Sequence, residues 1–191
     1  QYKPIPHTPF DTTANSPFMK EAMEVYNTGK NLTEEQNLIA NYWDCNPYKL
    51  NVTGHAMHAT KKITPGGHWM SITRIAGIKA NSDFVTTAYS YAITSIALFD
   101  GFISCWDEKF RSNLIRPESV INQYIDEDWQ PLLQTPPFPE YTSGHSVISA
   151  ASAVALASVY GENFAFTDST EVRFGLPVRE FPSFEAACQE A

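Results

Sequence analysis

Hydrophobic residues cover nearly every face of the longest apolar segment, residues 83–109. A helix with this pattern is either the centre of a helical bundle or a membrane span. The segment is long enough to cross a bilayer, but Asp100 and several threonines and serines interrupt it. We therefore predict the central helix of a bundle and no membrane span. Residues 143–160 form a second apolar segment, whose alanines and serines allow close helix packing.

Shorter helices are predicted on both sides of these two segments. Three of the starts carry a capping serine or threonine, and the first of them also has a proline in its first turn. The predicted helices are residues 16–28, the segment that follows the capping-box pair Thr33 and Gln36, residues 68–79, and the segment after Ser183.

Three segments lack a helical pattern. Residues 46–64 are a polar connection, residues 131–139 are a proline-rich crossover too broken for regular structure, and residues 164–178 could hold a short strand or an extended loop. The fold class is therefore mostly α, a helical bundle.

The domain organisation follows from this pattern. We expect one domain overall, in which a helical region of residues 1–64 packs on a bundle core of residues 65–191.

The composition narrows the class of protein. With 43% hydrophobic and 18% charged residues in 191, the chain is typical of a soluble globular protein. A net charge of −8 argues against nucleic-acid binding, which requires a basic face. On this acidic background Lys109, Arg111 and Arg116 form a local basic cluster, which favours an anion site over a solvated face.

Two segments, KFRSNLIRP and PEYTSGHS, carry the candidate chemistry. Lys109 and Arg116 are separated by six residues and repel each other unless an anion lies between them. Ser143 and Gly144 begin a helix after a rigid loop, where backbone N–H groups attract an anion. His145 could move a proton. The alternative for the first segment is two solvated cations, and for the second an N-cap serine beside an ordinary histidine. The presence of both segments together favours an oxyanion site.

The other histidines give weaker signals. His55 and His58 lie three residues apart and could share a metal, but no carboxylate or cysteine stands at a suitable spacing. Two polar loop histidines are the preferred interpretation. We expect His68, beside Trp69, to pack in the core or at its rim.

The two segments resemble the first and second motifs of the type 2 phosphatidic acid phosphatase superfamily, which joins acid phosphatases, lipid phosphatases and vanadium-dependent haloperoxidases. The resemblance covers residues 65–191 and implies a helical bundle of the vanadium chloroperoxidase or acid phosphatase type. Thr142 departs from the pattern, because the family usually has proline there. That position shapes the turn rather than the chemistry.

Two aromatic residues sharpen the resemblance toward haloperoxidases. Trp106 and Phe138 match the pair that flanks the halide site in vanadium chloroperoxidases. By resemblance, the vanadate cofactor would be bound by a lysine, an arginine and the serine–glycine pair, with a histidine as the acid–base group. The residues at these positions are Lys109, Arg116, Ser143, Gly144 and His145.

The resemblance implies an enzyme that oxidises halide with hydrogen peroxide, in which Lys109 polarises the bound peroxide. The alternative is a phosphatase that hydrolyses phosphomonoesters through a phosphohistidine intermediate and binds phosphate in the same cage. A further alternative is a non-catalytic oxyanion-binding or structural relative. The family also implies an exported protein, periplasmic or extracellular, and leaves a homodimer open.

A third motif of the family supplies the histidine that binds vanadium axially or attacks phosphorus. No histidine follows His145 in this sequence. We therefore expect the axial histidine after Ala191 and the bundle to be incomplete at the C-terminus. The 191 residues alone should bind oxyanions weakly and catalyse little.

Overall fold

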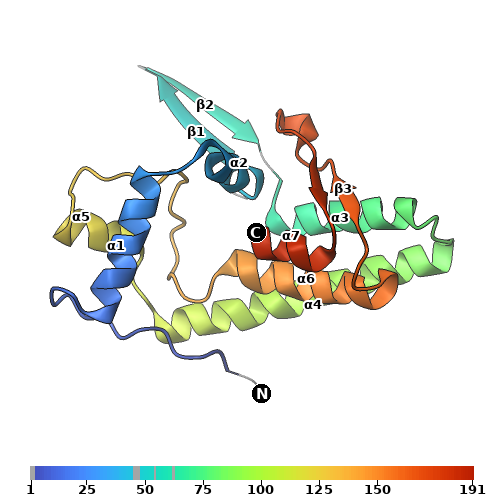
Figure 1. Cartoon of the computed structure of the whole chain (residues 1–191), viewed down its shortest axis with the longest axis horizontal. Helices are drawn as coiled ribbons and strands as arrows, with labels where there is room; N and C mark the ends of the chain where they lie inside the picture. Colours follow the sequence, from blue (N-terminus) through green and yellow to red (C-terminus); the bar gives the residue numbers. More distant parts are fainter. Residues whose placement is uncertain (1–2, 45–47, 54, 62) are drawn as a thin grey trace. The chain divides into compact units, whose positions relative to one another are not determined.

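The computed structural model describes residues 3–44, 48–53, 55–61 and 63–191, and it is mostly helical, as predicted. Figure 1 labels the elements along the chain. The helices are α1 (Pro17–Lys30), α2 (Glu34–Tyr42), α3 (Pro65–Lys79), α4 (Phe84–Ser112), α5 (Pro117–Tyr124), α6 (Gly144–Tyr160) and α7 (Phe184–Glu190), with a 3₁₀ turn, η1, at Val172–Phe174. Two antiparallel pairs of strands join β1 (Tyr48–Thr53) to β2 (Ala56–Lys61) and β3 (Phe166–Asp168) to β4 (Arg179–Phe181).

Polar residues begin several helices as the sequence predicts. Ser16 caps α1, and its side chain accepts a hydrogen bond from the backbone of the first turn. Thr33 and Gln36 form a reciprocal capping box before α2, with N···O distances of 2.9 and 3.1 Å. The Ser183 hydroxyl accepts from the Ala186 N–H at 3.0 Å at the start of α7. These three predictions are confirmed.

Three elements differ from the prediction. Helix α3 begins at Pro65 rather than at residue 68, because Thr64 caps it and proline suits the first helical position. Helix α5 was not predicted, although Pro117 gives it the same start. The connection predicted at residues 46–64 contains the β1–β2 hairpin instead. Alternating apolar and polar residues at 48–53 were the period-2 signal for it.

Backbone contacts divide the chain into two compact units. The first unit comprises residues 1–41 and 104–143, and the second comprises residues 42–103 and 144–191. Helix α4 contributes residues to both. The predicted boundary between residues 64 and 65 does not coincide with this division. The organisation as a helical region packing on a bundle core stays a prediction.

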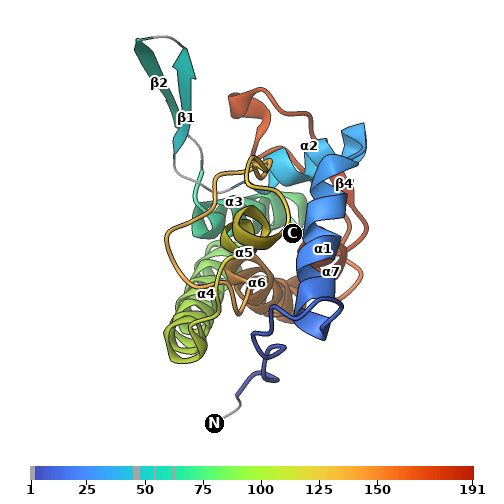
Figure 2. The ribbon, with the colours of Figure 1, turned by 90° about the vertical axis from the view of Figure 1, so that its left-hand side faces the viewer.

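The core of the first unit forms where α1 packs against α5 (Figure 2). Phe18, Ala22 and Val120 are buried there, and partly buried apolar side chains surround them. Gly29 lies against the ring of Trp129, since a Cβ at this glycine would come within 3.1 Å of the indole. This unit therefore has its own hydrophobic core.

In the second unit, α6 packs against α3 and α7, and β3 contacts α3 (Figure 1). Ile72, Leu156 and Phe184 are fully buried in this core. Ser149 and Ser152 of α6 are also buried, so the small residues of this helix do lie at helix contacts.

Helix α4 is not buried on all sides, contrary to the expectation for a central helix. Within the second unit its apolar side chains include Phe84, Val85, Ile96 and Phe99, all more than half exposed. Gly101 is the point where α4 approaches α6, because a Cβ there would lie 3.4 Å from the Ala151 Cβ. Among the helices of the described residues, none combines the length and the apolar character needed to cross a membrane.

Candidate functional site

Lys109 lies in the last turn of α4, in the first unit, and its side chain is almost fully buried, with 1% exposed. Its Nζ donates hydrogen bonds to the carbonyls of Pro139 and Glu140, both at 2.8 Å. Burial lowers the pKa of Lys109 below its ordinary value of 10.5, and the nearby Arg116 charge lowers it further, against the opposing effects of Cys105 and Glu140. The ammonium is held by neutral oxygens rather than by a carboxylate.

Arg116 directly precedes α5 and is also held by the proline-rich crossover. Its Nε donates to the Phe138 carbonyl at 2.5 Å, and its Nη1 donates to Glu140 Oε2 at 2.6 Å. The third nitrogen, Nη2, is buried and has no hydrogen-bond partner among the described residues. A buried donor without an acceptor costs about 1–3 kcal/mol, and more in a charged group, so an acceptor is expected there.

Two aromatic rings complete this cluster. The rings of Trp106 and Phe138 lie 5.0 Å apart between centroids. Lys109 Nζ is 5.1 Å from the Phe138 centroid and 5.8 Å from the Trp106 centroid, and Arg116 Cζ is 4.9 Å from Phe138. Aromatic faces attract cations and exclude water. The first unit thus brings together four of the predicted site residues.

The crossover has no helix or strand within residues 131–139, as predicted, and side chains of α4 hold the segment that follows it. The Ser112 hydroxyl donates to the Tyr141 carbonyl at 3.4 Å. Cys105 contacts both the carbonyl and the hydroxyl of Thr142, at 3.5 and 3.4 Å. Thr142, where a proline was expected, is therefore tied to α4 by its own polar atoms.

The remaining predicted residues stand at the start of α6. Ser143 is exposed and ends the first unit, while Gly144 is the first residue of α6 and belongs to the second. Within the second unit, His145 is half-buried and its Nε2 lies 2.8 Å from the Trp43 carbonyl. Because a carbonyl only accepts, Nε2 carries a hydrogen and donates it, which fixes the tautomer of the neutral ring.

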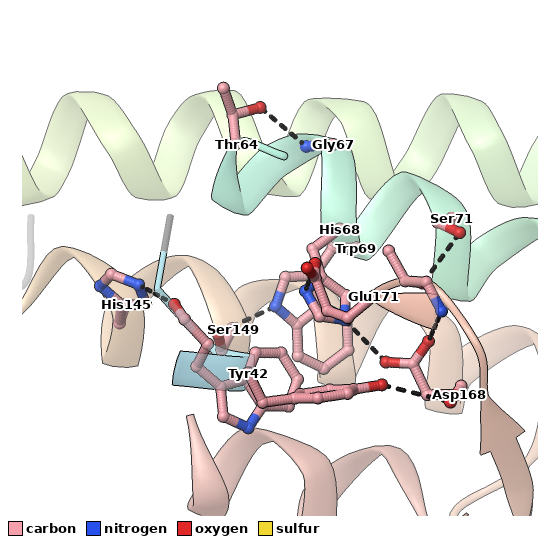
Figure 3. Close-up of polar contacts among 12 residues, drawn as sticks. Tyr42, Thr64, Gly67, His68, Trp69, Ser71, His145, Ser149, Asp168 and Glu171 are labelled. Atoms are coloured by element: carbon pink, nitrogen blue, oxygen red, sulfur yellow. Dashed lines mark hydrogen bonds and ion pairs between the residues drawn. The ribbon is translucent and has the colours of Figure 1, made fainter. Parts of the chain in front are cut away.

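A buried cluster around His68, Asp168 and Glu171 (Figure 3) fixes Trp43 in the second unit. The indole stacks on the His68 ring, with centroids 4.6 Å apart, and its Nε1 donates to Glu190 at 3.0 Å. His68 in turn lies between two carboxylates, with Nε2 at 2.7 Å from Asp168 and Nδ1 at 3.3 Å from Glu171. The orientation of His145 thus depends on a cluster that the sequence did not indicate.

The buried carboxylates confirm only part of the expectation for His68. It is a core residue, as expected, but its Nε2 also lies within hydrogen-bond distance of a buried carboxylate. Burial tends to raise the pKa of Asp168, yet the hydrogen bond and charge of His68, with bonds from Thr170, bring it below its ordinary value of 3.8. Asp168 is one hundred residues from His68, so no local motif could have revealed the pair.

The two histidines of the metal alternative are not both described. His55 is exposed in the turn between β1 and β2, and the side chain of His58 lies outside the described residues. Within the part of the chain that the structure describes, no three or more His, Cys, Asp or Glu residues gather as metal ligands would.

Comparisons with known proteins agree with the two motifs. Residues 89–191 match the family model described as "VCPO second helical-bundle domain", VCPO denoting vanadium chloroperoxidase. The whole chain is also similar to a solved chain titled "Crystal structure of the first bacterial vanadium dependant iodoperoxidase", with 54% identity and a TM-score of 0.90. The similarity covers 100% of this chain and 45% of that one, so this chain spans less than half the length of that solved relative. No curated protein matches the chain.

Proposed function

Because the chain belongs to the vanadium-dependent haloperoxidases, we propose that it supplies the oxyanion-binding part of an enzyme that oxidises halide with hydrogen peroxide. The observation that carries this proposal is Arg116. Its guanidinium is held at two nitrogens, while the buried Nη2 has no partner among the described residues. The buried ammonium of Lys109 contacts the same crossover segment. One oxyanion could therefore accept hydrogen bonds from both cations.

The donor set fits a tetrahedral oxyanion such as vanadate. An ammonium has three N–H donors, and among the described contacts of Lys109 two of them go to carbonyls. The third N–H and the Nη2 group of Arg116 would hold ligand oxygens, together with the hydroxyl of Ser143 and the backbone N–H of Gly144. When bound, vanadate supplies a Lewis acid that activates hydrogen peroxide without a change of its own oxidation state.

The remaining residues have separate roles in the proposal. His145 exchanges a proton at Nδ1, because the Trp43 carbonyl holds the Nε2 hydrogen. Trp106 and Phe138 give the halide an apolar wall and limit the access of water, which strengthens the attraction between the cations and the oxyanion. Iodide is the halide to test first, because the solved relative is titled an iodoperoxidase.

The test compares two reactions of the protein as its gene encodes it, namely iodide oxidation by hydrogen peroxide and phosphomonoester hydrolysis. We expect vanadate to activate iodide oxidation, and His145→Ala to lower the rate roughly 10²- to 10⁴-fold, as the loss of a general acid–base group does. His55→Ala, at an exposed turn, is the matched control and should leave the rate unchanged.

Other outcomes would select the alternatives. Phosphomonoester hydrolysis that vanadate inhibits, without iodide oxidation, would indicate a phosphatase. Absence of both activities, with weak oxyanion binding, would indicate a non-catalytic relative.

A further inference from the structure

Glu140 contacts both cations of the candidate site through different atoms. Its carbonyl accepts from Lys109, and its carboxylate accepts from Arg116. We propose that Glu140 is a positioning residue, which holds the Arg116 guanidinium in the orientation that presents Nη2 to the oxyanion. The inference rests on the proposed oxyanion binding, and it adds a residue that neither motif assigned a role.

Hydrogen bonds of its own backbone hold Glu140 in place. Its N–H donates to the Leu114 carbonyl at 3.0 Å, and its own carbonyl receives the Lys109 hydrogen bond at 2.8 Å. Leu114 lies two residues before Arg116, so Glu140 is anchored beside the residue that it orients. The carboxylate therefore starts from a defined position.

The guanidinium is clamped at two of its three nitrogens. Nε donates to the Phe138 carbonyl at 2.5 Å and Nη1 donates to the Glu140 carboxylate at 2.6 Å. A guanidinium is planar and rigid, so two contacts at different nitrogens fix both its plane and its rotation within that plane. The Phe138 ring, 4.9 Å from Cζ, lies against the same group. Only Nη2 is left without a partner in the described structure.

The clamp has a functional consequence because arginine side chains are otherwise mobile. Binding an anion normally requires the side chain to be ordered, and a group that is ordered beforehand binds more tightly. Glu140 supplies this order from a side chain that is 37% exposed, so replacing it should not disturb a core. Its negative charge is neutralised by the pair with Arg116.

The experiment is a double-mutant cycle read by NMR. The ¹⁵N-labelled chain is titrated with orthovanadate and, separately, with inorganic phosphate, and the backbone amide signal of Lys109, which every variant retains, is followed. We expect Glu140→Ala and Glu140→Asp to weaken binding roughly 3- to 10-fold, the cost of ordering one long side chain. Glu140→Gln keeps an acceptor oxygen at full reach and should bind within about 3-fold of the parent chain.

The second arm repeats Glu140→Ala in an Arg116→Ala background. If Glu140 acts through Arg116, it should then have no further effect on binding. Glu127→Ala is the matched control, since it removes the same charge from an exposed position of the first unit and should leave affinity unchanged.

Each contrary result has a distinct meaning. Unchanged affinity in Glu140→Ala or Glu140→Asp, or an equal loss in the Arg116→Ala background, would overturn the positioning role alone. Unchanged affinity in Arg116→Ala itself would overturn both this role and the oxyanion site. Should Glu140→Ala fail to fold, Glu140→Asp decides the matter, because it keeps the charge and shortens the reach.

Discussion

At the scale of single residues, Lys109 is a buried cation whose charge is only partly balanced by the groups around it. Two carbonyls solvate the ammonium, and the adjacent Arg116 repels it. Such a group is costly to keep charged in the absence of a ligand, and an anion would restore the charge balance. The lysine is therefore suited to binding an oxyanion rather than to stabilising the fold.

This leads to a pH prediction for anion binding. Burial lowers the Lys109 pKa below 10.5, so Lys109 should lose its proton, and the site its affinity, at a lower pH than an ordinary lysine would allow. Sulfate is the suitable probe, because its own charge does not change in this range. Its affinity, measured by calorimetry from neutral to alkaline pH, should fall before the ordinary lysine pKa is reached.

The control for that titration is a pair of variants. Lys109→Met should weaken sulfate binding roughly tenfold or more at neutral pH, as expected for a lost charge-assisted hydrogen bond, and should remove the alkaline fall. Lys79→Met, at an exposed position of α3, should leave the profile unchanged. An alkaline fall that persists in Lys109→Met would assign the titration to another group.

A second residue-scale prediction concerns Asp168. Its folded-state pKa is lowered, so the folded chain binds fewer protons than the unfolded chain between the two pKa values, and stability rises with pH in that window. Asp168→Asn should cost about 3 kcal/mol at neutral pH, because it leaves buried His68 with one carboxylate fewer. The difference from the parent chain should shrink as the pH falls below 3.8.

Chemical denaturation at several pH values measures this difference. Asp107→Asn is the matched control, because the Asp107 side chain is 71% exposed and should contribute little at any pH. A difference that stays constant into acid would mean that Asp168 does not titrate as proposed.

The sequence could indicate a site residue only where its partners lie close to it along the chain. Lys109 and Arg116 could be named because one short segment contains both. Trp43 could not, because its contact to His145 joins residues about one hundred positions apart. The same holds for His68 with Asp168. Pairing across such separations depends on tertiary packing, which a local motif does not encode.

At the scale of elements, Gly101 sets how closely α4 approaches α6 within the second unit. Gly101→Ala should be tolerated, since its Cβ would meet Ala151 at an ordinary contact distance of 3.4 Å. Alanine also favours the helix by up to about 1 kcal/mol. Gly101→Leu should instead destabilise by about 1–3 kcal/mol, because its side chain has no room.

Comparing the alanine and leucine variants of Gly101 separates helix propensity from packing. In thermal unfolding, we expect the alanine variant to be as stable as the parent chain or more stable, and the leucine variant to be less stable. Equal stability of the alanine and leucine variants would show that α4 and α6 do not pack closely at this residue.

Element prediction succeeded where the signal lay in neighbouring residues. Caps at Ser16, Thr33 and Ser183 mark helix starts through contacts within one turn. The hairpin at residues 48–61 was missed because its histidines and polar residues suggested a loop, although the apolar positions of β1 alternate. Burial of α4 was overestimated, because an apolar sequence does not specify what covers each face.

At the scale of the whole molecule, the residues predicted to bind an oxyanion fall in both compact units. Lys109, Arg116 and Ser143 belong to the first, and Gly144 and His145 to the second. This chain spans 45% of the length of the solved relative. The activity proposed above is therefore tested on the protein as its gene encodes it.

One measurement tests this site most directly, namely an NMR titration of the ¹⁵N-labelled chain with orthovanadate in which the Arg116 Nε–H and the Lys109 amide are followed together. We predict that both signals shift along one curve with a single dissociation constant. Signals that stay unchanged, or shifts scattered over exposed lysines, would contradict an oxyanion site built from these residues.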